Sequence, residues 1–141
     1  MRKNIQTYKK VDVESNVIAS DPHRIISLLY NGIFENLAKV KGAIQRKDLA
    51  AKSMNLTKAI NIFRALEDAL DFEKEPKISE NFHNLYEYCI AVLSEVSVSL
   101  ELKRVDEVVD LLKPLSDAWQ QMPEQDKEEG LQLLKRKEAA S

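Results

Sequence analysis

Glycine, proline and cysteine are scarce in this sequence, and each shortage excludes a class of protein. The 141 residues include three glycines and four prolines, too few for the many turns of an all-β sandwich or barrel. The single cysteine, Cys89, excludes an intramolecular disulfide and is typical of a reducing compartment. No apolar run approaches the roughly 20 residues of a membrane span, and the basic N-terminus lacks the apolar stretch of a secretory signal. We therefore expect a cytoplasmic protein without membrane insertion.

Charge is nearly balanced, with 21 Lys and Arg residues against 23 Asp and Glu residues. The cations are concentrated in residues 1–70 and the carboxylates in residues 71–141. A sequence pI near 5.8 argues against nucleic-acid binding, which usually needs a strongly basic domain. The simpler interpretation of the asymmetry is that the two halves of one domain attract each other.

Four segments carry apolar residues at the three- and four-residue steps of an amphipathic helix. Two of them have clear starts: Asp21 is a good N-cap followed by Pro22 at the first helical position, and Asp48 can cap the second helix. Short links between the segments favour an all-α fold, an antiparallel up-down-up-down four-helix bundle over residues 21–123. The four predicted helices are residues 22–44, 49–70, 78–100 and 105–122.

Two stretches lie outside the predicted bundle. Residues 1–20 lack a long helical stripe and form a lead-in segment, for which docking on the bundle is the favoured hypothesis and a disordered N-terminus the alternative. Residues 124–141 are mostly polar or charged, and they predict a weakly helical or disordered tail.

Two residues interrupt the helical pattern. Gly32 follows Asn31, a pair that ordinarily favours a hairpin turn, yet the apolar period continues through it. We therefore expect this glycine to let another helix approach closely, at a cost of about 1 kcal/mol in helix propensity. Pro114 falls inside the last apolar stripe, where proline removes a backbone hydrogen bond. It predicts a local kink or a restart of the helix.

The sequence offers few residues for catalysis or metal binding. A di-iron bundle needs a Glu-x-x-His motif from each of two helices, and only Glu80 with His83 has that spacing. Cys89 lies on the apolar stripe of the third helix, which predicts a buried and unreactive thiol. The glycines are too scattered for a phosphate-binding loop. We therefore expect no catalytic residue, metal site or cofactor, and predict a binding protein rather than an enzyme.

The predicted helices carry more apolar residues than one core-facing stripe needs. A broad stripe accounts for about half of the surplus, and the remainder would leave an apolar patch on a monomer, which is typical of a protein interface. Grooves between the helices of a bundle suit an amphipathic partner helix. The surplus residues are Ile25, Leu28, Tyr30, Phe34, Ile62, Tyr86, Tyr88, Ile90, Leu93, Val109 and Leu111.

Several motifs along the chain are specific to one protein family when their order and spacing are taken together. They are Tyr8, the runs 20–32, 70–73 and 81–88, Leu111-Leu112 and Ala118-Trp119. From Tyr8 to Trp119 the chain resembles the FliS family, the export chaperones of flagellin. It departs from the family pattern at Asn31, where many members have aspartate, and at Pro114.

The resemblance implies a non-enzymatic, cytoplasmic bundle that binds the C-terminal segment of newly made flagellin. That segment is unstructured until it polymerises or meets the chaperone, and it would wrap around the bundle as helices and extended pieces. Binding would prevent premature filament assembly and keep flagellin competent for flagellar type III export, with components of the export apparatus as further partners. A long apolar groove would offset the cost of ordering such a segment, at about 25 cal/mol per Å² of apolar surface buried.

A generic helical adaptor or homodimerisation module is the alternative. In that case the surplus apolar face would meet a second copy of the chain. A core should lie between the third and fourth helices, burying Leu85, Cys89, Val92, Leu112, Leu115 and Trp119. A role at the surface or in partner binding is the alternative for Trp119, because tryptophan is enriched at interface hot spots.

Ten residues are candidates for partner binding, with core packing as the competing role for Ile33, Leu66 and Leu93. Ile5 and Tyr8 lie three residues apart and share a face if they form a helical turn. We expect them to cover part of the apolar groove when flagellin is absent. The ten candidates are Ile5, Tyr8, Tyr30, Ile33, Ile62, Leu66, Phe72, Tyr86, Ile90 and Leu93.

Overall fold

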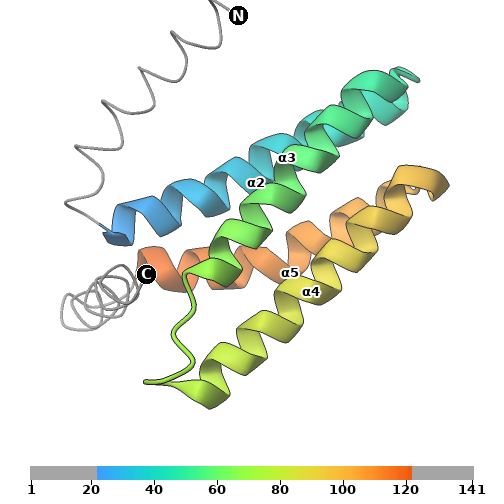
Figure 1. The fold of residues 1–141 in the computed structure, drawn as a ribbon. Helices are drawn as coiled ribbons and strands as arrows, with labels where there is room; N and C mark the ends of the chain where they lie inside the picture. Colours follow the sequence, from blue (N-terminus) through green and yellow to red (C-terminus); the bar gives the residue numbers. More distant parts are fainter. Residues whose placement is uncertain (1–21, 122–141) are drawn as a thin grey trace, which may run out of the picture.

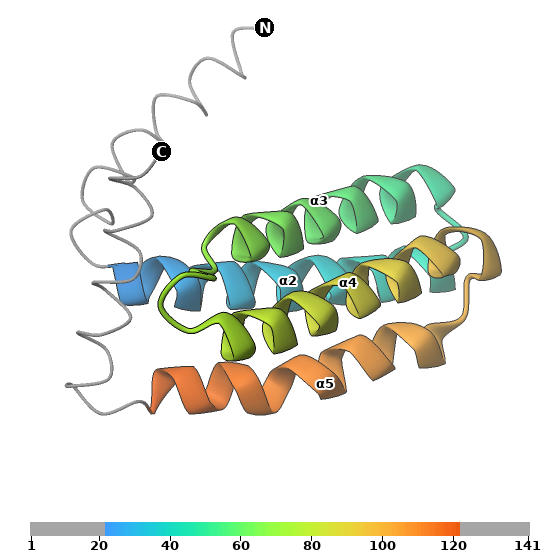
Figure 2. The same ribbon diagram turned by 60° about the horizontal axis from the view of Figure 1, so that its bottom comes forward.

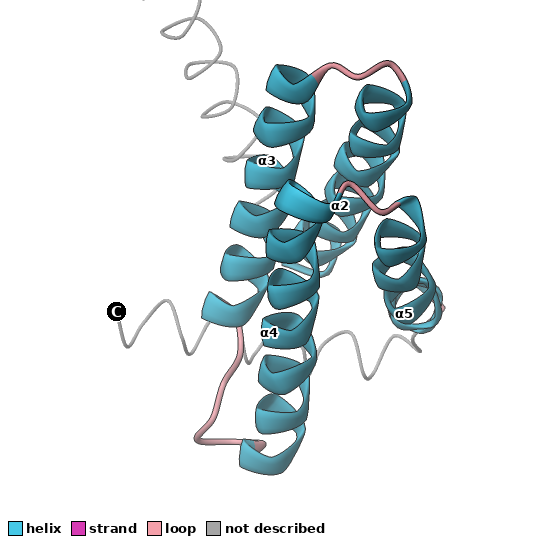
Figure 3. Cartoon of the chain, turned by 90° about the vertical axis from the view of Figure 1, so that its right-hand side faces the viewer, coloured by secondary structure: helices cyan, strands magenta, loops and turns pink. Residues whose placement is uncertain are grey.

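Four α-helices and their connections make up residues 22–121, the part of the chain that the computed structural model describes. None of these residues forms a strand, which confirms the all-α prediction (Figure 3). None of these helices is both long enough and apolar enough to cross a membrane. The predicted lead-in, the N-cap Asp21 and the charged tail lie outside the described residues. The helices are α2 (Pro22–Gln45), α3 (Leu49–Asp68), α4 (Pro76–Ser99) and α5 (Leu102–Gln120).

The helices form an antiparallel up-down-up-down bundle, as predicted (Figures 1 and 2). Helix α2 packs against α3 and α5, and α4 packs against the same two helices. Helices α2 and α4 therefore face each other across the diagonal of the bundle. The connections lie at alternate ends of the bundle, at residues 46–48, 69–75 and 100–101.

Local chemistry explains where the helices begin and end. Asp48 is the N-cap of α3, as predicted, because its carboxylate accepts a hydrogen bond from the Ala51 amide at 3.1 Å. Helix α2 ends where Lys47 adopts the left-handed conformation, with φ of 61°. The Lys47 and Asp48 amides then donate to the carbonyls of Ile44 and Ala43, which would otherwise lack partners.

The predicted apolar stripes form one continuous core. Burial of their side chains supplies the main stabilising free energy of a bundle without disulfides. Every helix contributes side chains that are almost completely buried: Ile33, Leu37 and Val40 from α2, Phe63 from α3, Cys89, Val92, Leu93 and Val96 from α4, and Val105, Val108 and Leu112 from α5.

Gly32 lies at a close contact between two helices, as expected, whereas Pro114 does not interrupt its helix. A Cβ atom added to Gly32 would lie 3.0 Å from Cδ1 of Ile62 on α3, which confirms that the glycine permits a close approach of another helix. Helix α5 continues through Pro114, so the predicted restart does not occur. Pro114 and Asp110, whose carbonyl would accept the missing hydrogen bond, are both exposed. Water can therefore satisfy that carbonyl.

Polar contacts join the cationic first half of the chain to the acidic second half. Lys41 on α2 pairs with Asp106 on α5 at 2.6 Å. Lys52 on α3 is a buried cation whose ammonium donates to the Ser97 carbonyl at 2.7 Å, in the last turn of α4. A cation at this position satisfies a terminal carbonyl and complements the helix dipole. These contacts agree with the predicted attraction between the two halves.

The two helical glycines provide a matched test of the close contact. Gly42→Ala should stabilise the chain by about 1 kcal/mol through helix propensity, because its Cβ would meet only the flexible end of Arg46. Gly32→Ala should gain less, because Ile62 is packed against the core and must move. Urea unfolding of both variants measures the difference. Equal gains would show that the Gly32 contact imposes no constraint.

Candidate functional site

The structure places most of the predicted partner-binding residues inside the core. Phe72 is the exception, with 47% of its surface exposed on the connection between α3 and α4, and Ile62 is half-buried. Ile5 and Tyr8 lie outside the described residues. A partner can reach the buried candidates only if the helices separate. These buried candidates are Tyr30, Ile33, Leu66, Tyr86, Ile90 and Leu93.

Tyr30 and Tyr86 have a clear structural role. Their hydroxyl groups form a hydrogen bond of 2.8 Å in the core, although α2 and α4 are diagonal to each other. The Tyr86 ring also packs against Phe63 and Phe82, at centroid distances of 6.0 and 5.9 Å. Burial raises the pKa of both tyrosines, so both hydroxyls remain neutral. The pair links the two diagonal helices through the centre of the bundle.

Trp119 packs against the first helix of the bundle, whereas the sequence predicted a place between α4 and α5. Its ring stacks on His23 at a centroid distance of 4.8 Å. Its indole Nε1 donates to the His23 carbonyl at 3.0 Å, and the imidazole Nε2 of His23 lies 2.9 Å from the Trp119 carbonyl. Leu85, Leu115 and Trp119 are partly buried, whereas Cys89, Val92 and Leu112 are in the core as predicted.

Partly exposed apolar side chains follow the seam between α4 and α5. Tyr88 on α4 donates to Glu107 on α5 at 3.1 Å, which fixes the register of the two antiparallel helices. One turn further along α5 comes Leu111, which is 38% exposed, and Tyr88 is 45% exposed. We call this surface the α4–α5 strip; its residues lie three or four positions apart on their helices and are Leu85, Tyr88, Leu111 and Leu115.

A shallow and open hollow with an acidic lining lies on the outer face of α5, beside the α4–α5 strip. Leu111 forms part of the wall of this hollow, and Lys103 supplies the one cation among its lining residues. Three carboxylates complete the lining, those of Asp106, Glu107 and Asp110. Sequence reasoning counted Tyr88 and Leu111 as surplus apolar residues but did not select them for partner binding. Each of them is an apolar residue that lies just outside the core-facing stripe of its helix, and this pattern is the sequence signal that could have identified them.

The described residues contain little reactive chemistry. Burial, with a smaller effect of Glu107, raises the pKa of the Cys89 thiol to about 11, which confirms that this cysteine is an unreactive core residue. His83 does not pair with Glu80, the residue of its Glu-x-x-His motif. It instead lies 3.0 Å from Glu67 on α3. The fold and its surface define a four-helix bundle with apolar side chains on its outer face.

Known proteins identify the family within that class. A family model described as "Flagellar protein FliS" matches residues 4–126. The chain is 38% identical over 117 residues to the flagellar secretion chaperone FliSB of Pseudomonas aeruginosa, covering 83% of this chain and 93% of that protein. It is 31% identical over 123 residues to the flagellar secretion chaperone FliS of Vibrio cholerae, covering 87% and 90%. The Salmonella typhimurium protein of that name is 34% identical over 119 residues, covering 84% and 88%.

The chain belongs to the FliS family. The matches span the lead-in, the whole bundle and the start of the tail. They confirm the resemblance that the sequence motifs indicated.

The tyrosine pair generates a stability prediction. Tyr30→Phe or Tyr86→Phe alone should cost about 1–3 kcal/mol, because each leaves one buried hydroxyl without its partner. The double variant should cost less than the sum of the two single variants, since no unpaired hydroxyl remains. Urea unfolding of the three variants and the parent measures this coupling. Strictly additive losses would show that the hydroxyl groups do not depend on each other.

Proposed function

We propose that this member of the FliS family is a cytoplasmic export chaperone for flagellin and that it binds the C-terminal segment of flagellin. The family supports the chaperone role, because the relatives are named flagellar secretion chaperones rather than enzymes. Bound in this way, flagellin cannot polymerise before export through the flagellar type III apparatus, whose components are proposed as further partners.

The observation that carries the binding site is the α4–α5 strip. Its four apolar residues line the seam between two antiparallel helices, where an amphipathic helix of the partner can lay its apolar face. The neighbouring hollow is rimmed by Asp106, Glu107 and Asp110. Asp106 already pairs with Lys41 and Glu107 with Arg104, so Asp110 is the carboxylate that a docking helix can satisfy with a lysine, arginine or amide donor. A partner helix can therefore bury apolar side chains on the strip and be oriented by a charged contact beside it, while the core of the bundle stays closed.

Other proposed contacts lie away from the strip, as expected for a segment that wraps around the bundle. Phe72 projects from the connection between α3 and α4, and Ile62 lies where α3 approaches α2. Ile5 and Tyr8 of the lead-in remain proposed contacts that cover apolar surface before flagellin binds. The surface of the bundle thus supplies several separate apolar positions rather than one deep pocket.

A homodimerisation module is the alternative function, because a second copy of the chain could cover the same exposed apolar side chains of the strip. Size-exclusion chromatography of the free chain, followed by the mixture with flagellin, separates the two functions. A chaperone forms a complex with flagellin, whereas a dimerisation module elutes as a dimer in both runs.

Charge introduced at the proposed contacts tests the binding surface. Leu111→Asp and Phe72→Asp should each weaken binding of the flagellin C-terminal segment by at least about tenfold, because the new carboxylate is buried without a partner only in the complex. Val98→Asp is the matched control, since Val98 is 87% exposed and lies at the C-terminal end of α4, whereas Phe72 precedes the N-terminal end of that helix. Isothermal titration gives the affinities and circular dichroism checks the fold.

Two outcomes would contradict different parts of the proposal. If the parent chain shows no binding at about 10 µM, flagellin is not its partner. If the parent binds and both variants bind equally well, the function stands but the surface is wrong. A loss in Val98→Asp as large as that in Leu111→Asp would also contradict the assigned surface.

A further inference from the structure

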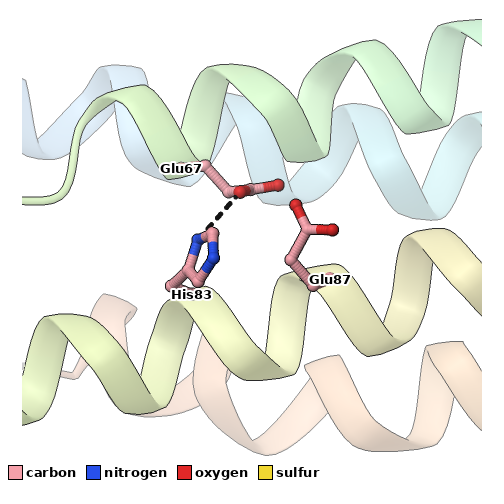
Figure 4. Close-up of side chains that lie close together, drawn as sticks. All are labelled: Glu67, His83 and Glu87. Atoms are coloured by element: carbon pink, nitrogen blue, oxygen red, sulfur yellow. Dashed lines mark ion pairs between the residues drawn. The ribbon is translucent and has the colours of Figure 1, made fainter.

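Three side chains with metal-ligating atoms converge between α3 and α4, close to the connection at residues 69–75 (Figure 4). Glu67 projects from α3, and His83 and Glu87 project from α4. One ligand atom from each lies within 4.8 Å of the others. His83 and Glu87 are four residues apart, which places them on the same face of the helix. His83 Nδ1 already lies 3.0 Å from Oε2 of Glu67.

The cluster carries more negative than positive charge on the side that faces the bundle. The side chain of Glu67 is only 12% exposed and faces a second carboxylate, that of Glu87. The nearby cation is Arg64, which lies outside the cluster with 53% of its side chain exposed. Its Nη1 is 2.6 Å from Glu87 and 3.3 Å from Glu67. Two carboxylates and an imidazole thus share one space with a single, mostly solvated guanidinium.

We propose that Glu67, His83 and Glu87 form a binding site for a divalent transition-metal ion, with Zn²⁺ as its first candidate, and that the ion ties α3 to α4. One imidazole nitrogen and two carboxylate oxygens are ligands that Zn²⁺ accepts, with water in the fourth position. The ion would also neutralise the two facing carboxylates. The site lies apart from the α4–α5 strip, but the ring of Phe72, a proposed flagellin contact, packs edge-on against His83 at a centroid distance of 6.2 Å.

The geometry needs only side-chain movement to accommodate the ion. Ligand atoms at about 2.0–2.1 Å from a tetrahedral ion lie about 3.3 Å from one another. The His83–Glu67 distance already meets this requirement, and Glu87 is the ligand that must approach. The Glu87 side chain is 42% exposed, so it can change rotamer without disturbing the core. Its ion pair with Arg64 must weaken when it does so.

The sequence did not reveal this site because its ligands come from two helices. The Glu-x-x-His motif directed attention to Glu80, which is exposed and does not belong to the cluster. The actual carboxylates are Glu67, sixteen residues before His83, and Glu87, one turn after it. Only the antiparallel pairing of α3 with α4 brings the three together.

Zn²⁺ titration of the tag-free full chain tests the proposal. We expect one ion per chain with a dissociation constant of about 10 µM or tighter and a raised thermal midpoint. His83→Gln and Glu67→Gln should each weaken Zn²⁺ binding at least tenfold. Glu80→Gln is the matched control and should bind as the parent does. Substitution by Co²⁺ gives a visible absorption band that reports coordination directly.

Arg64→Gln supplies a readout that a general loss of stability would not produce. It should tighten Zn²⁺ binding, because it releases Glu87 from the competing ion pair. A parent dissociation constant weaker than about 10 µM would overturn the proposal. Parent-like affinity in His83→Gln would overturn it as well, with circular dichroism confirming that each variant is folded.

Discussion

Burial of one apolar stripe from each of four helices is the constraint on which the rest of this structure depends. The chain has a single cysteine and therefore no internal disulfide, and the ion pairs between its helices are partly exposed and contribute little. The stripes must consequently meet along the whole length of the bundle. This requirement fixes the outer faces as well, because an apolar residue beyond the stripe has no place except the surface.

The central tyrosine pair shows how the core selects one arrangement of the helices. Apolar packing alone would tolerate small rotations of each helix. The buried hydroxyls of Tyr30 and Tyr86 must find each other across the diagonal, because an unpaired buried hydroxyl is costly. At the end of the bundle, His23 and Trp119 make a second reciprocal contact between α2 and α5. These contacts hold the helices in the register that creates the α4–α5 strip.

Periodicity predicted the helices well because local rules decide them. Asp48 caps α3 and Gly32 lies at a close approach, as the sequence indicated. Periodicity could not predict how wide the buried stripe of each helix would be. Tyr30 and Tyr86 were therefore assigned to partner binding, although they face each other in the core.

The same limit explains the other differences between sequence and structure. The position of Trp119 depends on His23, a residue 96 positions away. The cluster around His83 depends on the pairing of α3 with α4. Contacts of this kind arise from the rotation of packed helices, which no pattern within one helix records. The helix count and boundaries were therefore predictable, whereas the burial of Tyr30, Tyr86 and Ile90 was not.

The central claim is that flagellin binds to outer faces of the bundle while the core stays closed. Methyl-labelled NMR of the chain, titrated with the flagellin C-terminal segment, tests it most directly. We predict large shifts for the methyl groups of Leu111, Leu115 and Ile62, with little change for the core residues Ile33 and Leu93. Large shifts confined to Ile33 and Leu93 would contradict the account, because they would show that the helices separate to admit flagellin.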